Sequence, residues 1–197
     1  MAKLIAIEGI DGAGLSTQSQ LLEEYLRKKG HKVILTKEPT VTLLGGLIKS
    51  ALRNEWKVDP LALQLLFAAD RANHLAFEIT PALKKGFDVI MDRYYFSTIA
   101  YGEASGIDRN FLKQLNSKFR RPEILIILDL PAKIAINRIK ETRFSLALSE
   151  RRQFLEKVRI AFRKIFQENK DIAKVVDAAH PIQEVHKEIR EFVESKL

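Results

Sequence analysis

The sequence predicts an α/β fold in which a five-stranded parallel sheet is flanked by helices on both faces. Five short apolar segments alternate with stretches of helical periodicity, which is typical of a parallel sheet. The first apolar segment leads directly into a glycine-rich turn at residues 9–17, and a helical pattern follows that turn. The chain has 197 residues, of which 46% are hydrophobic, and this suits a single domain, residues 1–197, with a substantial core.

The beginning of the chain predicts a strand, a helix and a second strand. The apolar run at residues 3–8 is the first strand, and helical periodicity follows over residues 16–29. Gly30 comes just after this pattern, where glycine commonly ends a helix, and residues 31–36 form the next apolar run. Strands joined by a helix in this way pair in parallel through a right-handed crossover.

Two helical segments follow the second strand. Residues 43–52 predict a short helix, although Gly45 and Gly46 disfavour one. A longer helical pattern covers residues 59–85, and it begins with an Asp-Pro pair of the kind favoured at helix N-termini. Pro81 lies inside this pattern, so we expect a break or a kink there.

The remaining strands are three further apolar runs. Residues 87–91 and 124–130 are almost wholly apolar, which is typical of strands buried on both faces. Residues 174–177 form the last and shortest strand, and residues 182–193 form a closing helix. Together these runs complete the five expected strands.

Residues 9–17, Gly-Ile-Asp-Gly-Ala-Gly-Leu-Ser-Thr, match the phosphate-loop pattern GxxxxGK[ST] at all but one of its defined positions. In that pattern, backbone N–H groups turn toward phosphate oxygens, the lysine reaches the outer phosphates and the hydroxyl binds Mg²⁺. Gly9 and Gly14 frame the loop here, and Ser16 supplies the hydroxyl. Leu15 stands at the lysine position. The loop therefore predicts nucleotide binding, with one charge missing.

A charged pair, Asp92 and Arg93, directly follows the buried strand at residues 87–91. Open α/β sheets bind their ligands at the carboxyl ends of the strands. Charges beside a buried strand also need partners, because unpaired buried charges are strongly destabilising. We therefore expect this pair to belong to a functional site.

Composition narrows the possible partners. The net charge is +8, from 33 basic and 25 acidic residues, but the basic residues are spread along the chain without interleaved aromatic residues. This pattern does not favour nucleic-acid binding and suits a small polyanion such as a nucleotide. There is no cysteine for disulfides and no apolar run long enough for a membrane span, so we expect a cytoplasmic protein with no membrane partner.

Residues 141–152 contain three arginines and have no sheet pattern. In a phosphotransferase, such a segment would form a short lid that excludes water and brings guanidinium groups to the transferring phosphate. A solvated helical hairpin is the alternative interpretation.

Four segments in a fixed order together resemble the thymidylate kinase family. They are Glu-Gly-Ile-Asp-Gly-Ala-Gly-Leu-Ser-Thr-Gln at residues 8–18, Leu-Leu-Phe-Ala-Ala-Asp-Arg-Ala-Asn-His at residues 65–74, Asp-Arg-Tyr-Tyr-Phe-Ser at residues 92–97 with Ala-Tyr at residues 100–101, and Val-Asp-Ala at residues 176–178. The resemblance covers nearly the whole chain. It implies a P-loop NTPase fold, transfer of the ATP γ-phosphoryl group to dTMP with Mg²⁺ as cofactor, and a homodimer.

On the donor side, the resemblance implies separate residues for each part of ATP. Arg138 would stack on the adenine, with Ala178 beside it. Arg143 and Arg151 would reach the phosphates from the lid. The loop residues implied to bind the phosphates are Gly9, Asp11, Gly12, Ala13, Gly14, Leu15, Ser16 and Thr17.

The residues implied to act at the transferring phosphate lie at the strand end and in the loop. Arg93 would clamp the phosphate of the acceptor, and Asp92 would join Ser16 in holding Mg²⁺. Asp11 would bind the 3′-hydroxyl of the deoxyribose, although it could instead simply form the turn before Gly12. The catalytic set that the resemblance implies is Arg93, Asp92, Asp11, Arg143 and Arg151.

On the acceptor side, Phe67 would stack on the thymine and Arg71 would hydrogen-bond its carbonyl edge. A spacing of four residues places both on one helix face. Without the resemblance, Phe67 would be interpreted as a core residue and Arg71 as part of a surface ion pair. Ser97 would support the base pocket and Tyr101 would close over the sugar. The implied acceptor set is Asp11, Glu38, Lys49, Phe67, Arg71, Arg93, Ser97 and Tyr101.

Two positions depart from the family pattern. Leu15 replaces the loop lysine, and lid arginines together with Lys3 or Lys49 would then supply part of the missing charge. Gly102 stands where many members have glutamine. Gly12 places the chain with those members that have glycine there and rely on lid arginines, whereas other members carry a basic residue. These departures leave two alternatives open: a nucleotide-binding protein without catalysis, and a kinase for another nucleoside monophosphate.

Overall fold

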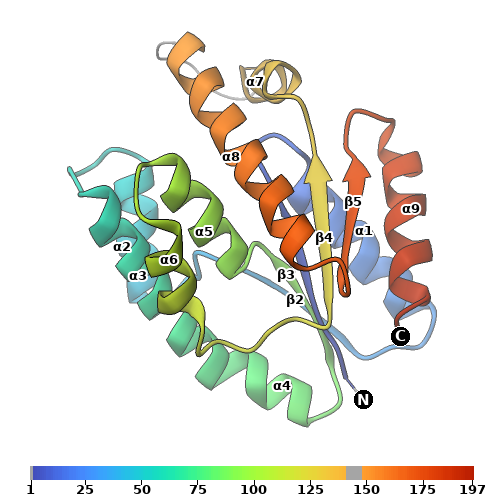
Figure 1. Ribbon diagram of the computed structural model, residues 1–197. Coiled ribbons are helices and arrows are strands. Elements are labelled where there is room, and N and C mark those ends of the chain that lie inside the picture. Colours follow the sequence, from blue (N-terminus) through green and yellow to red (C-terminus); the bar gives the residue numbers. More distant parts are fainter. Residues whose placement is uncertain (1, 141–147) are drawn as a thin grey trace.

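Five parallel strands form one sheet in the computed structural model, which describes residues 2–140 and 148–197 (Figure 1). The order across the sheet is β2-β3-β1-β4-β5. The strands are β1 (Leu4–Gly9), β2 (Val33–Lys37), β3 (Asp88–Asp92), β4 (Ile124–Asp129) and β5 (Ala173–Asp177). Each strand coincides with one of the apolar runs, so the predicted α/β fold is confirmed.

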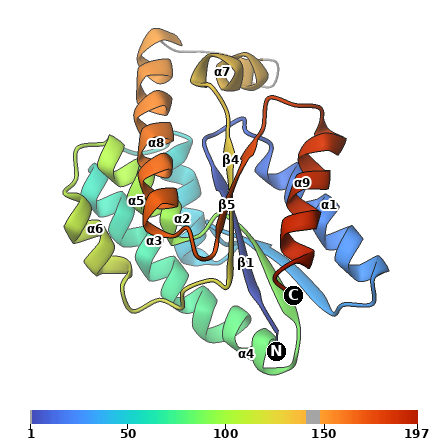
Figure 2. The same ribbon diagram turned by 45° about the vertical axis from the view of Figure 1, so that its right-hand side comes forward.

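Helices pack on both faces of this sheet, as Figure 1 and Figure 2 show. On one face lie α1 (Leu15–Lys28) and α9 (Ile182–Glu194), and on the other lie α3 (Pro60–His74), α5 (Tyr95–Ala104) and α8 (Leu148–Glu168). The other helical elements in the described part of the chain are α2 (Leu43–Leu52), the π-helical turn η1 (Leu75–Ile79), α4 (Thr80–Lys84), α6 (Arg109–Asn116) and α7 (Ala132–Lys140). None of the described helices is long and apolar enough to cross a membrane.

The central strands are buried because helices cover both of their faces. Every residue of β1 and β3 is buried, as are all but the last residue of β4. In the parallel pairing of β1 with β3, Ile7 stands opposite Asp92. The two strands therefore end side by side, and the phosphate loop lies next to the charged pair that follows β3.

Gly45 and Gly46 do not prevent residues 43–52 from forming a helix, so the prediction of α2 is confirmed. A Cβ atom on Gly45 would lie only 2.0 Å from the carbonyl oxygen of Thr40. Gly45 therefore allows α2 to pack tightly against the loop that precedes it.

Pro81 lies where the π-helical turn η1 passes into α4, and the prediction of a break there is wrong. Helical structure continues from α3 through η1 into α4, and Pro81 lies in the first turn of α4. Proline donates no backbone hydrogen bond, and its ring crowds the carbonyl group one turn earlier. The π-helical turn just before it uses wider hydrogen-bond spacing, which accommodates the proline without ending the helix.

Candidate active site

The glycine-rich loop between β1 and α1 presents backbone groups at the start of a helix. Gly12 and Gly14 have φ angles of 84° and 93°, which favour glycine. Gly14 is the N-cap of α1, and no side chain caps the first turn. The N–H groups of that turn are therefore available to an anion, and the helix dipole favours negative charge there.

Close packing beneath the loop also requires glycine at two positions. A Cβ atom on Gly9 would lie 2.7 Å from the carbonyl oxygen of Leu128 in β4. A Cβ atom on Gly12 would lie 2.7 Å from the carbonyl oxygen of Ala135 in α7. A basic side chain at position 12 would therefore require the backbone of α7 to move.

Leu15 begins α1 and belongs to the hydrophobic core. Its side chain is 5% exposed, and its Cδ1 atom lies 3.4 Å from the place a Cβ would take on Gly9. Leu15 therefore packs beneath the loop and offers the phosphates no charge. The suggestion that Lys3 supplies that charge is wrong, because Lys3 precedes β1 and lies at the far end of a strand about 20 Å long.

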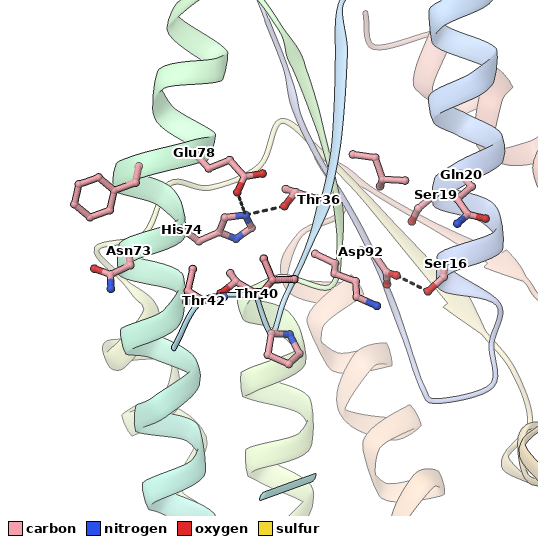
Figure 3. A pocket seen from close by; sticks show the side chains of 15 residues that line it. Ser16, Ser19, Gln20, Thr36, Thr40, Thr42, Asn73, His74, Glu78 and Asp92 are labelled. Atoms are coloured by element: carbon pink, nitrogen blue, oxygen red, sulfur yellow. Dashed lines mark hydrogen bonds and ion pairs between the residues drawn. The ribbon is translucent and has the colours of Figure 1, made fainter. Parts of the chain in front are cut away.

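Ser16 and Asp92 meet where the loop leads into α1. The Ser16 hydroxyl donates a hydrogen bond of 2.5 Å to the buried Asp92 carboxylate (Figure 3). Hydroxyl and carboxylate oxygens suit Mg²⁺, which usually completes its coordination with waters and substrate phosphates. No cluster of three or more His, Cys, Asp or Glu residues that could hold a metal occurs among the described residues. The pair therefore fits a metal ion that also binds nucleotide phosphates.

Arg93 links the end of β3 to the phosphate loop. Its guanidinium donates hydrogen bonds to the Asp11 carboxylate at 2.8 Å and to the Gly9 carbonyl oxygen at 3.0 Å. Its φ angle of 73° is a left-handed conformation, which destabilises a non-glycine residue by about 1–3 kcal/mol. Burial alone would lower the pKa of Arg93, but the electrostatic pull of Tyr101 and Asp11 outweighs burial and raises that pKa. Arg93 is thus a fixed positive charge beside the loop.

Glu8 is a buried acid behind this cluster, and it is not among the site residues predicted from the sequence. Its carboxylate accepts hydrogen bonds from the Tyr94 N–H at 2.9 Å, the Ser97 N–H at 3.2 Å and the Ser97 hydroxyl at 2.5 Å. Burial raises the pKa of Glu8 to about 7, although these hydrogen bonds and Arg93 oppose the shift. The available signal was an acid in an apolar run, immediately before the glycine turn.

Arg71 is buried and is held by residues from three different segments. Its Nη2 atom lies 2.6 Å from a carboxylate oxygen of Glu38 and 3.1 Å from the Thr98 hydroxyl. Its Nη1 atom donates to the Asn116 side-chain oxygen at 2.8 Å. The side chain is 1% exposed, so the alternative of a surface ion pair is wrong. No motif in the sequence marks Thr98 or Asn116, which come from α5 and α6.

The face of α3 that carries Arg71 also carries Phe67 and Gln64. Phe67 is half-buried, whereas Gln64 is buried and its Oε1 atom has no hydrogen-bond partner among the described residues. A Cβ atom on Gly102 would lie 2.7 Å from Leu112 and 3.3 Å from the Gln64 Cγ atom. A glutamine at position 102 would therefore clash with α6, and Gln64 occupies the adjacent space.

Tyr101 and Ser97 lie on α5 next to Arg93. The Tyr101 hydroxyl accepts a hydrogen bond of 3.0 Å from the Asp11 N–H, and the Arg93 guanidinium lies 5.5 Å from the centre of the Tyr101 ring. Ser97 accepts a hydrogen bond of 3.2 Å from Arg93. Ser97 thus lies within the charged cluster, while its neighbour Thr98 contacts the buried arginine of α3.

The two residues expected around the adenine meet beside the loop. Arg138 donates a 3.0 Å hydrogen bond to the Ala178 carbonyl oxygen, and its other terminal nitrogen lies 3.5 Å from the Gly12 carbonyl oxygen. Arg151 is exposed in the first turns of α8. Arg143 and most of the expected lid at residues 141–152 lie outside the residues that the structure describes.

Three further predicted residues lie at the margins of the cluster. Ala13 is buried within the loop, and Thr17 is exposed on the first turn of α1. Lys49 is half-buried on α2, and its side chain has no hydrogen bond or ion pair with another described residue. The structure therefore brings most of the predicted residues into contact with one another, whereas Lys49 makes no such contact.

Known proteins resemble this chain along nearly its whole length. The family model described as thymidylate kinase matches residues 7–189. A protein of Archaeoglobus fulgidus named probable thymidylate kinase is 42% identical over 196 residues, which are 98% of this chain and 96% of that protein. A protein of Thermococcus onnurineus, also named probable thymidylate kinase, is 40% identical over 201 residues, which are 98% of this chain and 98% of that protein. Probable thymidylate kinase 1 of Saccharolobus solfataricus is 41% identical over 198 residues, which cover 100% of both chains.

Proposed function

The chain belongs to the thymidylate kinase family of enzymes, and from that premise we propose that it transfers the γ-phosphoryl group of ATP to the 5′-phosphate of dTMP. The position of Arg93 carries the proposal. It contacts Gly9 and Asp11 of the phosphate loop on one side and Ser97 of α5 on the other. Phosphoryl transfer mainly requires aligned reactants and positive charge, and Arg93 can provide both where donor and acceptor phosphates would meet.

On the donor side, the backbone N–H groups from Gly12 to Ser16 would bind the ATP phosphates, and Arg138 would lie along the adenine. Ser16 and Asp92 would hold Mg²⁺, which neutralises charge on the phosphates when bound. The 2.5 Å contact between their side chains supports this assignment, because two oxygen donors are already side by side. Arginines of the lid would approach the same phosphates.

On the acceptor side, Phe67 would stack on the thymine, while Arg71 and Thr98 would form hydrogen bonds with its polar edge. The Arg71 Nε atom supports this arrangement, since it is buried and has no hydrogen-bond partner among the described residues. A buried donor without a partner is destabilising, and a thymine carbonyl would satisfy it. Tyr101 and Asp11 would contact the sugar, and Glu38 would fix Arg71 rather than touch dTMP.

The proposed partners are ATP, dTMP and a second copy of the chain, in the cytoplasm and without nucleic acid. The homodimer is supported by apolar side chains that α2 and α3 expose away from the sheet. Leu43 and Leu47 of α2 are 83% and 42% exposed, and Leu61 and Leu65 of α3 are 40% and 45% exposed. Several large apolar side chains exposed on two neighbouring helices are typical of an interface. Light scattering should give twice the chain mass, and Leu65→Lys should lower it.

A coupled assay of ADP formation with ATP, Mg²⁺ and dTMP tests the function. We expect dTMP-dependent turnover that exceeds the rates with dUMP, dCMP and dGMP. A protein that gains thermal stability with dTMP but forms no ADP would instead be a binding protein without catalysis. Faster turnover with another monophosphate would contradict the proposed acceptor.

A further inference from the structure

Leu15 leaves the outer phosphates of ATP without the cation that a phosphate loop normally provides. Two arginines contact the loop among the described residues, and both already have partners within the protein. Arg93 is paired with Asp11 at 2.8 Å, and Arg138 donates to the Ala178 carbonyl oxygen at 3.0 Å. In the part of the chain that the structure describes, the loop therefore contacts no cation that is without a partner in the protein.

Lys37 is the last residue of β2 and stands opposite Asp92 in the pairing of β2 with β3. Paired residues on neighbouring strands point to the same face of a sheet and are about 4.8 Å apart. The Asp92 side chain points toward α1, because it accepts the hydrogen bond from Ser16. The side chain of Lys37 therefore leaves the sheet toward α1, beside the end of the phosphate loop.

The residues on either side of Lys37 are anchored to the opposite face of the sheet. The Thr36 hydroxyl lies 2.9 Å from the His74 Nε2 atom, and Glu38 is paired with Arg71 at 2.6 Å. Both partners belong to α3. Since side chains alternate along a strand, these two contacts fix Lys37 on the α1 face.

Lys37 also lines a cavity of about 600 Å³ together with Ser16 and Asp92. Figure 3 shows this cavity between α1 and the helix formed by α3 and η1. The Lys37 side chain is exposed and has no hydrogen bond or ion pair with any other residue that the structure describes. The second acid of the cavity wall, Glu78, lies 3.4 Å from His74. The ammonium group of Lys37 is thus free to meet a ligand beside Ser16.

We propose that Lys37 supplies the positive charge that Leu15 cannot, by binding the outer phosphates of the donor nucleotide from the β2 side of the site. The inference rests on the proposed phosphotransfer function and assigns one of its residues. A lysine suits the task because its ammonium group is a mobile point charge that binds phosphate without fixed geometry. Its position next to Asp92 places that charge near the proposed metal ligands.

The test compares Lys37→Met in two backgrounds, the natural chain and the Leu15→Lys variant. In the natural chain, Lys37→Met should lower the turnover number by about 10²- to 10³-fold, the usual effect of removing one preorganised group from a transition state. In the Leu15→Lys background, Lys37→Met should lower the turnover number by less than about tenfold, because the restored loop lysine replaces the lost charge. Lys37→Arg should keep most of the activity.

Lys32→Met is a matched control, because Lys32 is an exposed lysine that precedes β2 at the other end of the strand. It should leave turnover unchanged.

Calorimetric titration without Mg²⁺ should show weaker ATP binding by Lys37→Met but unchanged AMP binding, since AMP lacks the outer phosphates. Equal losses in both backgrounds, or unchanged turnover and ATP affinity in Lys37→Met, would overturn the inference. A natural chain without turnover would contradict the proposed function instead, while the binding comparison would still test Lys37.

Discussion

The phosphate loop and the acceptor pocket that we propose around Arg71 would hold a charged substrate by different means. In the pocket, buried side chains from several segments carry paired charges, such as Arg71 with Glu38 at 2.6 Å. In the loop, the groups available to phosphate are backbone N–H groups, and the position that normally carries a lysine is filled by the buried Leu15. The pocket is therefore built from side-chain charge, and the loop from backbone geometry.

This difference shows which changes each half of the site tolerates. A network of paired, buried charges depends on every member, because removing one partner leaves the other uncompensated. Backbone donors do not depend on the side chain at their position, so a leucine at position 15 preserves the cradle and removes only one charge. That charge can then come from another strand of the sheet.

Arg93 lies between the phosphate loop and α5, where we propose that the two halves of the site meet, so its loss should have the largest effect on activity. Arg93→Ala should lower the turnover number with ATP and dTMP by at least about 10³-fold, as for other arginines that stabilise phosphoryl transfer. Steady-state ADP formation measures this. The control Arg121→Ala removes an exposed arginine paired with Asp171 and should leave the turnover number unchanged. A loss below tenfold for Arg93→Ala would mean that the two halves do not meet at this residue.

Arg71 tests the dependence of the pocket on paired charge. Arg71→Met should lower the free energy of unfolding by about 3–5 kcal/mol, since the buried Glu38 carboxylate loses its 2.6 Å contact with a positive charge. The double variant with Glu38→Gln should recover part of this loss. Urea unfolding provides the measurement, with Arg53→Met as the control because Arg53 and its partner Glu55 are exposed. If Arg71→Met is as stable as the control Arg53→Met, the pocket does not depend on the buried pair.

Glu8 predicts a smaller effect that depends on pH. Its pKa is about 7 in the folded protein, against an ordinary value of 4.5. Between these values the folded protein retains a proton that the unfolded chain has lost, so stability falls as pH rises from 4.5 to 7, by about 3 kcal/mol in total. Urea unfolding of the natural chain and Glu8→Gln at several pH values isolates this contribution. Parallel curves for the two proteins would show that folding does not raise the pKa of Glu8.

Much of the fold follows from local patterns in the sequence. The strands are predictable because buried parallel strands must be apolar on both faces, as at residues 124–130. The phosphate loop is predictable because its glycines are required by backbone geometry and close packing, as at Gly12, where a Cβ would meet the Ala135 carbonyl oxygen at 2.7 Å. Such constraints determine the residue type at the position itself, so they can be recognised in the sequence.

The pocket was less predictable because its contacts join distant segments. Arg71 can be placed on a helix face from spacing alone, but Thr98 and Asn116 become its partners only through the packing of α3, α5 and α6. The same packing excludes a larger side chain at Gly102, where a Cβ would lie 2.7 Å from Leu112. No pattern within one segment carries this information.

Leu15→Lys tests most directly whether the charge missing from the loop is supplied from elsewhere in the site. The lysine stem can follow the buried path of Leu15 while its ammonium group reaches the phosphates, and urea unfolding should confirm that the variant folds. The turnover number with saturating ATP, Mg²⁺ and dTMP should then change by less than about tenfold, because Lys37 already provides most of the charge. A rise of about 10²- to 10³-fold, the usual effect of one preorganised donor, would show that the natural site works without compensation and would contradict the role proposed for Lys37.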